Sequence, residues 1–255
     1  MTETVLQTEG LTKRFGELSA VDHVDLEVEA GEFRSVIGPN GAGKTTTFNL
    51  ITGALIPTEG TVRFNGEDIT TLPPHERVHR GVGRSFQITN VFGGLTVREN
   101  VRLAAQSVHG DEISSGEAMF RDKDSFPELT DRTNEILSQI GLRERAEETA
   151  QTLAYGDQRR LEIGLVLATD PELVMLDEPT AGMSTEETQD TMDLIDDVLS
   201  DQSLMLIEHD IDLVMRVSDN ITVLTRGQVL ASGTPEEIAA NEDVRDAYLG
   251  GARDE

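Results

Sequence analysis

Residues 38–46 form the motif that most restricts how this chain can fold. They read Gly-Pro-Asn-Gly-Ala-Gly-Lys-Thr-Thr and fit the phosphate-binding pattern G-x-x-x-x-G-K-[ST]. The apolar pair Val36-Ile37 precedes them as a strand would, and residues 45–51 follow as a helix. The glycines let successive backbone N–H groups face one point, where the helix N-terminus adds partial positive charge. The pattern therefore predicts a phosphate-binding loop, and the alternative of a plain glycine-rich turn is disfavoured by the Lys, the Thr and the strand–helix setting.

We expect this loop to bind ATP and Mg²⁺. Lys44 is placed to reach the β- and γ-phosphates, and the Thr45 hydroxyl is placed to bind the metal ion. The residues expected to contact the nucleotide are Gly38, Pro39, Asn40, Gly41, Ala42, Gly43, Lys44, Thr45 and Thr46.

Two carboxylates follow a second apolar run. Residues 173–176 are apolar and lead directly into Asp177 and Glu178. A buried strand that ends in acids places them at the edge where open α/β sheets bind ligands. Asp177 can hold the Mg²⁺ that Thr45 also touches, and Glu178 can polarise an attacking water. Alone, such a pair is usually a solvated strand end, but the phosphate loop favours the catalytic interpretation.

Composition narrows the class of protein. The chain has 255 residues and no Cys, which excludes disulfides and thiolate metal sites. No apolar run reaches the roughly 20 residues of a membrane span, and no signal-peptide pattern opens the chain, so we expect a cytoplasmic protein. Acidic residues number 48 against 21 basic ones. Because the acids are spread along the chain, we favour adaptation to high cytoplasmic salt over an acidic docking surface, and a nucleic-acid ligand is disfavoured.

The hydrophobic pattern alternates between strands and helices, which predicts an α/β fold. Arg34 and Ser35 are polar for a central parallel strand, so we expect one flank of it to meet water. Residues 107–127 read as an ordered loop inside a mostly helical stretch, 96–150. Strands are expected at 5–9, 21–28, 33–37, 60–66, 82–86, 173–176, 203–207, 221–224 and 228–231. Helices are expected after Pro73-Pro74, at 157–168, 186–199 and 210–218, and in a tail that begins with the capping box Thr234-Pro235-Glu236-Glu237.

Four further segments resemble motifs of the ATP-binding cassette (ABC) ATPases. The run Leu153-Ala154-Tyr155-Gly156-Asp157-Gln158 is similar to the signature motif, commonly Leu-Ser-Gly-Gly-Gln. Gln87 matches the Q-loop glutamine, and His209 matches the switch histidine. Phe15 matches the aromatic residue that stacks on adenine. The motifs occur in the family's order and cover nearly the whole chain.

The resemblance implies roles for these residues. Glu178, His209 and Lys44 would act in ATP hydrolysis, and Thr45, Gln87 and Asp177 would manage Mg²⁺. A helix beginning near Asp157 would offer N–H groups and a positive dipole end to an anion. In the family this motif completes the ATP site of a second subunit, so a homodimer or heterodimer with ATP between the chains is implied.

The chain also departs from the family pattern. Ala154 replaces the usual signature serine, and Tyr155 replaces a glycine. Asp157 adds a carboxylate near the expected anion, which should weaken attraction unless it caps the helix. Ser184 stands where many relatives carry an aspartate. Because Lys44, Asp177 and Glu178 are intact, we still expect hydrolysis.

The expected architecture is a P-loop NTPase of the ABC type, with an N-terminal antiparallel β subdomain and an inserted helical subdomain. The resemblance is to the larger ATPase of branched-chain amino acid importers, which implies integral membrane permeases, an external solute-binding protein and a peripheral position on the inner face of the membrane. The expected divisions are 1–86 and 158–233 for the nucleotide-binding core, 87–157 for the helical subdomain and 234–255 for a helical tail.

Several alternatives remain open at this point. A urea or amide importer and a lipopolysaccharide-type exporter use related ATPases. A soluble ABC ATPase that acts on DNA or ribosomes is disfavoured by the short insertion, the single cassette and the acidic surface. A non-hydrolysing ATP-sensing module is kept open by the altered signature motif.

Overall fold

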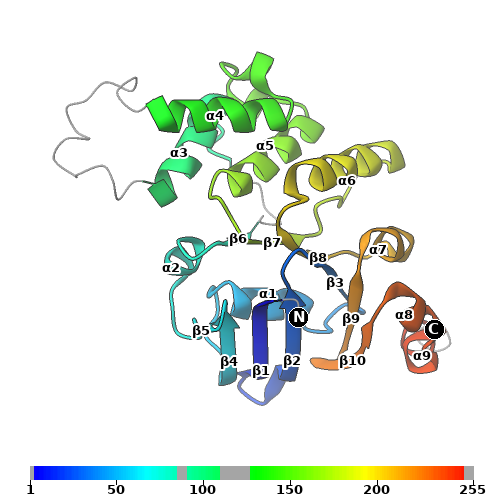
Figure 1. Cartoon of the computed structure of the whole chain (residues 1–255). Helices are drawn as coiled ribbons and strands as arrows, with labels where there is room; N and C mark the ends of the chain where they lie inside the picture. Colours follow the sequence, from blue (N-terminus) through cyan, green and yellow to red (C-terminus); the bar gives the residue numbers. More distant parts are fainter. Residues whose placement is uncertain (1–2, 85–90, 110–126, 250–255) are drawn as a thin grey trace. The chain divides into compact units, whose positions relative to one another are not determined.

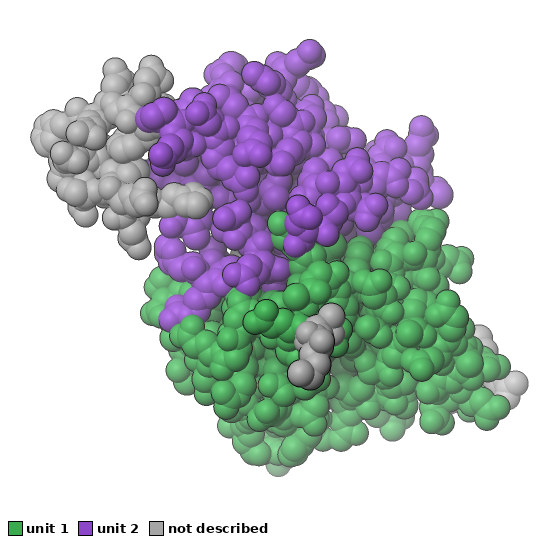
Figure 2. All heavy atoms as spheres, in the orientation of Figure 1, with its two compact units in different colours: residues 1–77, 175–178, 202–255 green, residues 78–174, 179–201 purple. Residues whose placement is uncertain are grey.

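The computed structural model describes residues 3–84, 91–109 and 127–249. These residues form two compact units, coloured separately in Figure 2. Unit 1 comprises Met1–Arg77, Met175–Glu178 and Gln202–Glu255, and unit 2 comprises Val78–Val174 and Pro179–Asp201. The predicted divisions at residues 86, 157 and 233 stay predictions, because a grouping by compactness does not test them.

An antiparallel sheet with the strand order β2-β1-β4-β5 belongs to unit 1 (Figure 1). The expected strands at 5–9 and 21–28 are confirmed, but both are longer than the alternating pattern indicated. The register shifts between Thr8 and Leu11, and Gly10 has φ +56°, so an irregular pairing carries the strands past a glycine. The bounds are β1 Thr4–Phe15, β2 Leu18–Glu29, β4 Glu59–Phe64 and β5 Glu67–Asp68.

A second sheet has the order β10-β9-β3-β8-β7-β6, and β3 pairs in parallel with both β8 and β9. Every residue of β7 and β8 is buried, as expected for parallel strands that read as continuous apolar runs. The strand pattern therefore confirms the predicted α/β class. The bounds are β3 Phe33–Ile37, β6 Val82–Arg84, β7 Leu173–Asp177, β8 Ser203–Ile207, β9 Asn220–Thr225 and β10 Gln228–Gly233.

Helices follow the strands in the expected places, and the capping box at Thr234 is confirmed. Part of the predicted loop at 107–127 is helical, because α3 continues to His109; residues 110–126 lie outside the described part of the chain. No helix in the described ranges is long and apolar enough to cross a membrane. The bounds are α1 Lys44–Ile51, α2 Pro74–Val78, α3 Val97–His109, α4 Pro127–Gln139, α5 Tyr155–Leu167, α6 Thr185–Leu199, α7 Ile211–Val217, α8 Pro235–Ala240 and α9 Glu242–Leu249.

The expectation that one flank of β3 meets water is wrong. Ser35 is fully buried, and its hydroxyl lies 2.6 Å from that of Ser218. The Arg34 guanidinium pairs with Glu32 at 2.6 Å and donates to the Thr222 hydroxyl at 3.0 Å. Polar partners in unit 1 bind the Ser35 hydroxyl and the two terminal nitrogens of Arg34, so polar residues in the strand do not require solvent.

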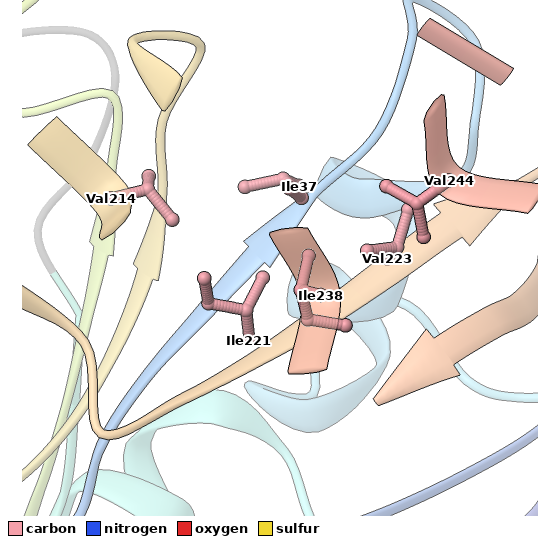
Figure 3. Close-up of a cluster of buried hydrophobic side chains, with 6 residues drawn as sticks. All are labelled: Ile37, Val214, Ile221, Val223, Ile238 and Val244. Carbon is pink, nitrogen blue, oxygen red and sulfur yellow. The ribbon is translucent and has the colours of Figure 1, made fainter. Parts of the chain in front are cut away.

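The C-terminal helices pack on the strand that leads into the phosphate loop. Ile238 of α8 and Val244 of α9 belong to one buried apolar cluster with Ile37, the last residue of β3, and with Ile221 and Val223 of β9 (Figure 3). Burying such side chains stabilises the fold by about 1.5–3 kcal/mol each. The tail therefore supports the base of the loop at residue 38.

The other end of α1 is held by a buried arginine. Arg77 is only 1% exposed, and its guanidinium donates to the carbonyl oxygens of Leu50 at 2.8 Å and Ile51 at 2.6 Å, at the end of α1. It also donates to the carbonyls of Thr70 at 2.8 Å and Leu72 at 3.0 Å. Burial lowers the pKa of Arg77 to about 10, so the group is still charged at neutral pH. Arg77 thus satisfies the last carbonyls of the helix that follows the phosphate loop.

We expect Arg77→Met to lower the free energy of unfolding by about 3–5 kcal/mol, because buried carbonyl oxygens would lose charged donors. Urea unfolding followed by circular dichroism measures this loss. Arg216→Met, at an exposed site of α7, serves as the control and should change stability by less than about 0.5 kcal/mol. A loss of under about 1 kcal/mol for Arg77→Met would contradict the structural role of Arg77.

Candidate nucleotide-binding site

The loop from Gly38 to Gly43 connects β3 to α1 and approaches neighbouring backbone closely. A Cβ atom on Gly38 would lie 2.2 Å from the Leu224 carbonyl oxygen, and one on Gly43 would lie 2.6 Å from that of Ala20. Gly43 also has φ +103°, a conformation that L side chains rarely adopt. Glycine is therefore required at both positions by contact as well as by backbone conformation.

Lys44 is turned back onto its own loop. Its ammonium donates to the carbonyl oxygens of Gly38 at 2.6 Å and Pro39 at 3.3 Å. Burial lowers the pKa of Lys44, and the nearby carboxylates of Glu178 and Asp177 partly oppose that shift. A compact positive charge thus stands at the start of α1, where a phosphate group would meet it.

Glu178 and His209 form a hydrogen-bonded pair. His209 Nε2 and Glu178 Oε1 lie 2.9 Å apart, and the Glu178 backbone N–H donates to the Ile207 carbonyl at 2.9 Å. Glu178 has φ +50°, which is uncommon for a residue other than Gly, Asn, Asp or His. Such backbone strain often occurs at functional sites, where surrounding contacts hold it in place. Asp177, the preceding residue, is only 1% exposed at the end of β7.

A cavity of about 610 Å³ brings these groups together within unit 1. Its wall combines the phosphate loop, one carboxylate, one imidazole and the half-exposed ring of Phe15, where the Lys13 ammonium lies 5.3 Å from the ring centre. The volume is of the size that small-ligand sites have. The cavity is lined by Phe15, Leu18, Ser19, Ala20, Asn40, Gly41, Ala42, Gly43, Lys44, Thr45, Thr46, Glu178, His209 and Arg226.

The predicted metal ligands supply oxygen donors. Thr45 lines the cavity, and Asp177 is buried within electrostatic range of Lys44, beside Glu178. Hydroxyl and carboxylate oxygens suit Mg²⁺, which takes its remaining ligands from phosphates and water. In the described residues no group of three or more His, Asp or Glu side chains could hold a metal ion. Gln87, the third predicted ligand, lies outside the described residues.

The predicted signature residues lie in unit 2, around the start of α5. Ala154 is the N-cap of the helix and provides no side-chain cap. Asp157 does not cap the helix either; its carboxylate forms an ion pair with Arg145. The Gln158 side chain donates to the Leu153 carbonyl at 3.0 Å, and no heavy atom would lie within 4 Å of a Cβ on Gly156.

Tyr155 connects this helix start to the turn after β7. Its hydroxyl donates to the Ala181 carbonyl at 3.0 Å, and the Arg159 guanidinium lies 5.8 Å from its ring centre. Ser184, in the same turn region, is the N-cap of α6, and Glu187 completes a capping box. Ser184 therefore has a structural use, and the spacing of Ser184 and Glu187 is the sequence signal that could have indicated it.

The structure brings together most of the predicted nucleotide-binding residues. Gly38 and Pro39 form the entry to the loop, and the loop residues 40–46 line one cavity with Phe15, Glu178 and His209. Sequence reasoning missed Leu18, Ser19, Ala20 and Arg226, which also line the cavity. The pattern offered one signal for Arg226, an arginine before glycine in a hairpin turn where Asn or Asp is usual.

Comparison with known families gives two matches along the chain. The family model described as ABC transporter matches residues 21–181. A second model, described as branched-chain amino acid ATP-binding cassette transporter, matches residues 228–254.

Individual relatives match over almost their whole length. The chain is 44% identical to the high-affinity branched-chain amino acid transport ATP-binding protein BraF of Pseudomonas aeruginosa, over 99% of this chain and 100% of that protein. It is also 44% identical to the corresponding protein LivG of Escherichia coli K12, with the same coverage. A probable branched-chain amino acid transport ATP-binding protein LivG of Archaeoglobus fulgidus is 34% identical, over 96% of this chain and 95% of that protein.

Solved structures of ATP-binding cassettes share the fold. MJ1267, an ATP-binding cassette of an ABC transporter, superposes with a TM-score of 0.84 at 30% identity, covering 97% of this chain and 99% of that one. Its ADP conformation gives a TM-score of 0.82 at 32% identity, covering 98% and 100% of the two chains. A dimeric post-hydrolysis state of the cassette MJ0796, bound to ADP and Pi, gives 0.74 at 27% identity, covering 90% and 98%.

The close backbone contact at Gly43 predicts that an added methyl group is more harmful there than at Gly41. We expect Gly43→Ala to lower the free energy of unfolding by about 3 kcal/mol and to weaken MgADP binding at least about tenfold, because the loop backbone must move. Gly41→Ala is the matched control, since φ is +79° there but no heavy atom lies within 4 Å of the added Cβ. It should cost only about 1 kcal/mol. Thermal unfolding and calorimetry distinguish the two variants, and equal effects would contradict the contact argument.

Proposed function

Because the chain belongs to the ABC transporter ATP-binding family, we propose that it is the ATP-hydrolysing subunit of an importer for branched-chain amino acids. The observation that carries the proposal is the cavity in which Lys44, the phosphate-loop amides and the Glu178–His209 pair face one space. The relatives that share 44% identity over their full length carry that transport function in their names.

In this proposal Glu178 is the general base. Its carboxylate orients the attacking water and accepts its proton, and the hydrogen bond from His209 fixes the direction of the carboxylate. His209, which lines the same cavity, would lie near the γ-phosphate. Lys44 leaves the carbonyls of Gly38 and Pro39 and stabilises negative charge on the phosphates. Phe15 provides a half-exposed ring on which adenine stacks.

Thr45, Asp177 and Gln87 would hold Mg²⁺, which neutralises charge on the transferred phosphoryl group when it is bound. The signature residues 153–158 would close on the nucleotide of a second ATPase subunit. Ala154 provides no hydroxyl there, so the first N–H groups of α5 would make the contact. We propose a dimer with ATP between the two subunits, opened by hydrolysis.

The remaining partners follow from the importer assignment. Permease subunits in the membrane would carry the solute, with an external binding protein to deliver it, and the chain would lie on the inner face of the membrane. The net charge of −27 suits a cytoplasm of high salt, because counterions screen the self-repulsion of the surface.

We expect Glu178→Gln to lower ATP turnover about 10²- to 10⁴-fold, because the amide cannot accept the proton of the attacking water. Nucleotide binding should stay within about threefold of the parent, since the substituted amide keeps the size of the side chain. A phosphate-release assay with the purified chain measures turnover. Glu236→Gln makes the same charge change at an exposed site of α8 and should leave turnover unchanged. Normal turnover of Glu178→Gln would remove Glu178 from the catalytic role.

The cargo is tested by uptake in cells that lack their own branched-chain amino acid transporter. Coexpressed with its permease and binding-protein partners, the chain should support uptake of labelled leucine, and the Glu178→Gln variant should abolish it. Excess isoleucine or valine should compete, whereas urea should not. Uptake that urea inhibits and valine does not would redirect the proposal to an amide importer.

A further inference from the structure

Arg226 is a cation on the nucleotide cavity to which neither the motifs nor the comparisons give a role. It lines the cavity together with Lys44, and these two are the Lys and Arg side chains among the lining residues. Glu178 is the carboxylate of the wall, and it is engaged with His209. The cavity is therefore more favourable to an anion than the strongly acidic chain around it.

The conformation of Arg226 is unusual for its residue type. Arg226 has φ +50° and Gly227 φ +82°, and the flanking residues Thr225 and Gln228 pair across the hairpin of β9 and β10. A two-residue hairpin loop with positive φ at both positions favours Asn-Gly or Asp-Gly. The chain uses Asn-Gly in the hairpin loop between β4 and β5, where Asn65 and Gly66 have φ values of +48° and +76°.

The non-glycine residues with positive φ in the described ranges fall into two groups. His23, Asn65 and Asp170 are of types that tolerate the left-handed region. Glu178 and Arg226 are not, and both line the nucleotide cavity. When a residue type that disfavours positive φ occupies such a position, its side chain is expected to have a role, because Asn, Asp or Gly would form the same turn with less strain.

The turn is fixed to the phosphate loop through its backbone. The Gly227 N–H donates to the Ala42 carbonyl at 3.0 Å, and the Asp22 N–H donates to the Gly227 carbonyl at 2.8 Å. A Cβ on Gly43 would lie 3.4 Å from the Cα of Gly227, so the turn touches the loop directly. These contacts hold the backbone of Arg226 at a set position beside the loop.

Within the described residues the Arg226 side chain has no competing partner. Over residues 3–84, 91–109 and 127–249 it forms no ion pair and no side-chain hydrogen bond, although the chain carries 48 acidic residues. Other arginines, such as the exposed Arg14 and the partly buried Arg132, pair with glutamates. The guanidinium is thus available to an anion that enters the cavity.

We propose that Arg226 is a nucleotide-binding residue, whose guanidinium contacts the phosphates of the bound nucleotide from the side of the β9–β10 turn. The proposal rests on nucleotide binding in this cavity, as set out under the proposed function. It adds a second cation to Lys44. Because Arg226 is exposed, its contribution is electrostatic and depends on salt.

The test is calorimetric titration of the purified full-length chain with MgADP, which avoids turnover. Arg226→Asn is the informative variant, because Asn suits the turn and should keep or raise thermal stability. We expect it to raise the Kd about three- to tenfold, as expected for losing an exposed charge contact. The increase should shrink between about 0.1 M and about 1 M KCl, because salt screens exposed charges.

Two further variants test whether a change in Kd comes from a contact made by Arg226 or from a change in the net charge of the protein. Arg226→Lys keeps the charge and should stay within about twofold of the parent. Arg216→Gln removes an exposed arginine of α7 that does not line the cavity, and it should leave the Kd unchanged. An unchanged Kd for Arg226→Asn, an equal loss for Arg216→Gln, or a Lys variant as weak as the Asn variant would overturn the proposal.

A Lys44→Ala variant separates this result from the proposed function. If Lys44→Ala abolishes MgADP binding and Arg226→Asn has no effect, the cavity binds nucleotide and Arg226 has no part in it. If the parent chain does not bind MgADP at all, the proposed function itself fails.

Discussion

The structure depends on the close backbone contacts that surround the phosphate loop. Gly38 lies against the Leu224 carbonyl of β9, and Gly43 lies against the Ala20 carbonyl of β2, at distances that leave no room for a Cβ. The Ala42 carbonyl accepts a hydrogen bond from Gly227, in the turn that follows β9. Strands far apart in the sequence therefore fix the loop. The loop amides can meet an anion in a set geometry because this backbone cannot relax.

An acidic chain that binds an anion needs its positive charge in the right place. The net charge of −27 would repel a nucleotide at long range, and salt reduces that repulsion more than it reduces a buried contact. Lys44 is buried against two loop carbonyls, so its charge acts at short distance. Arg226 lies further out and is exposed. Salt should therefore screen the charge of Lys44 very little and weaken the charge of Arg226 much more.

Much of the fold was predictable because its signals are local. The phosphate loop, the apolar strands and the capping box at Thr234 each depend on a few neighbouring residues. Partners distant in sequence could not be predicted. Arg34 and Ser35 were expected to face solvent, but they hydrogen-bond to Thr222 and Ser218, which lie more than 180 positions away in the sequence. The role proposed for Arg226 depends in the same way on a cavity whose wall combines β1, β2, the residues that follow β7 and β8, and the β9–β10 turn with the phosphate loop.

The helices differ in whether a side chain caps their N-terminus. Side chains cap several helix N-termini: Ser184 precedes α6, Asp210 precedes α7 and Thr234 precedes α8. The helix α1 begins after Gly43 and α5 begins after Ala154, and neither has a side-chain cap. Their first N–H groups therefore need another acceptor. Under the proposed function, phosphate on α1 and the nucleotide of a second subunit on α5 would satisfy both, and the main-chain N–H groups of α5 would serve without the signature serine.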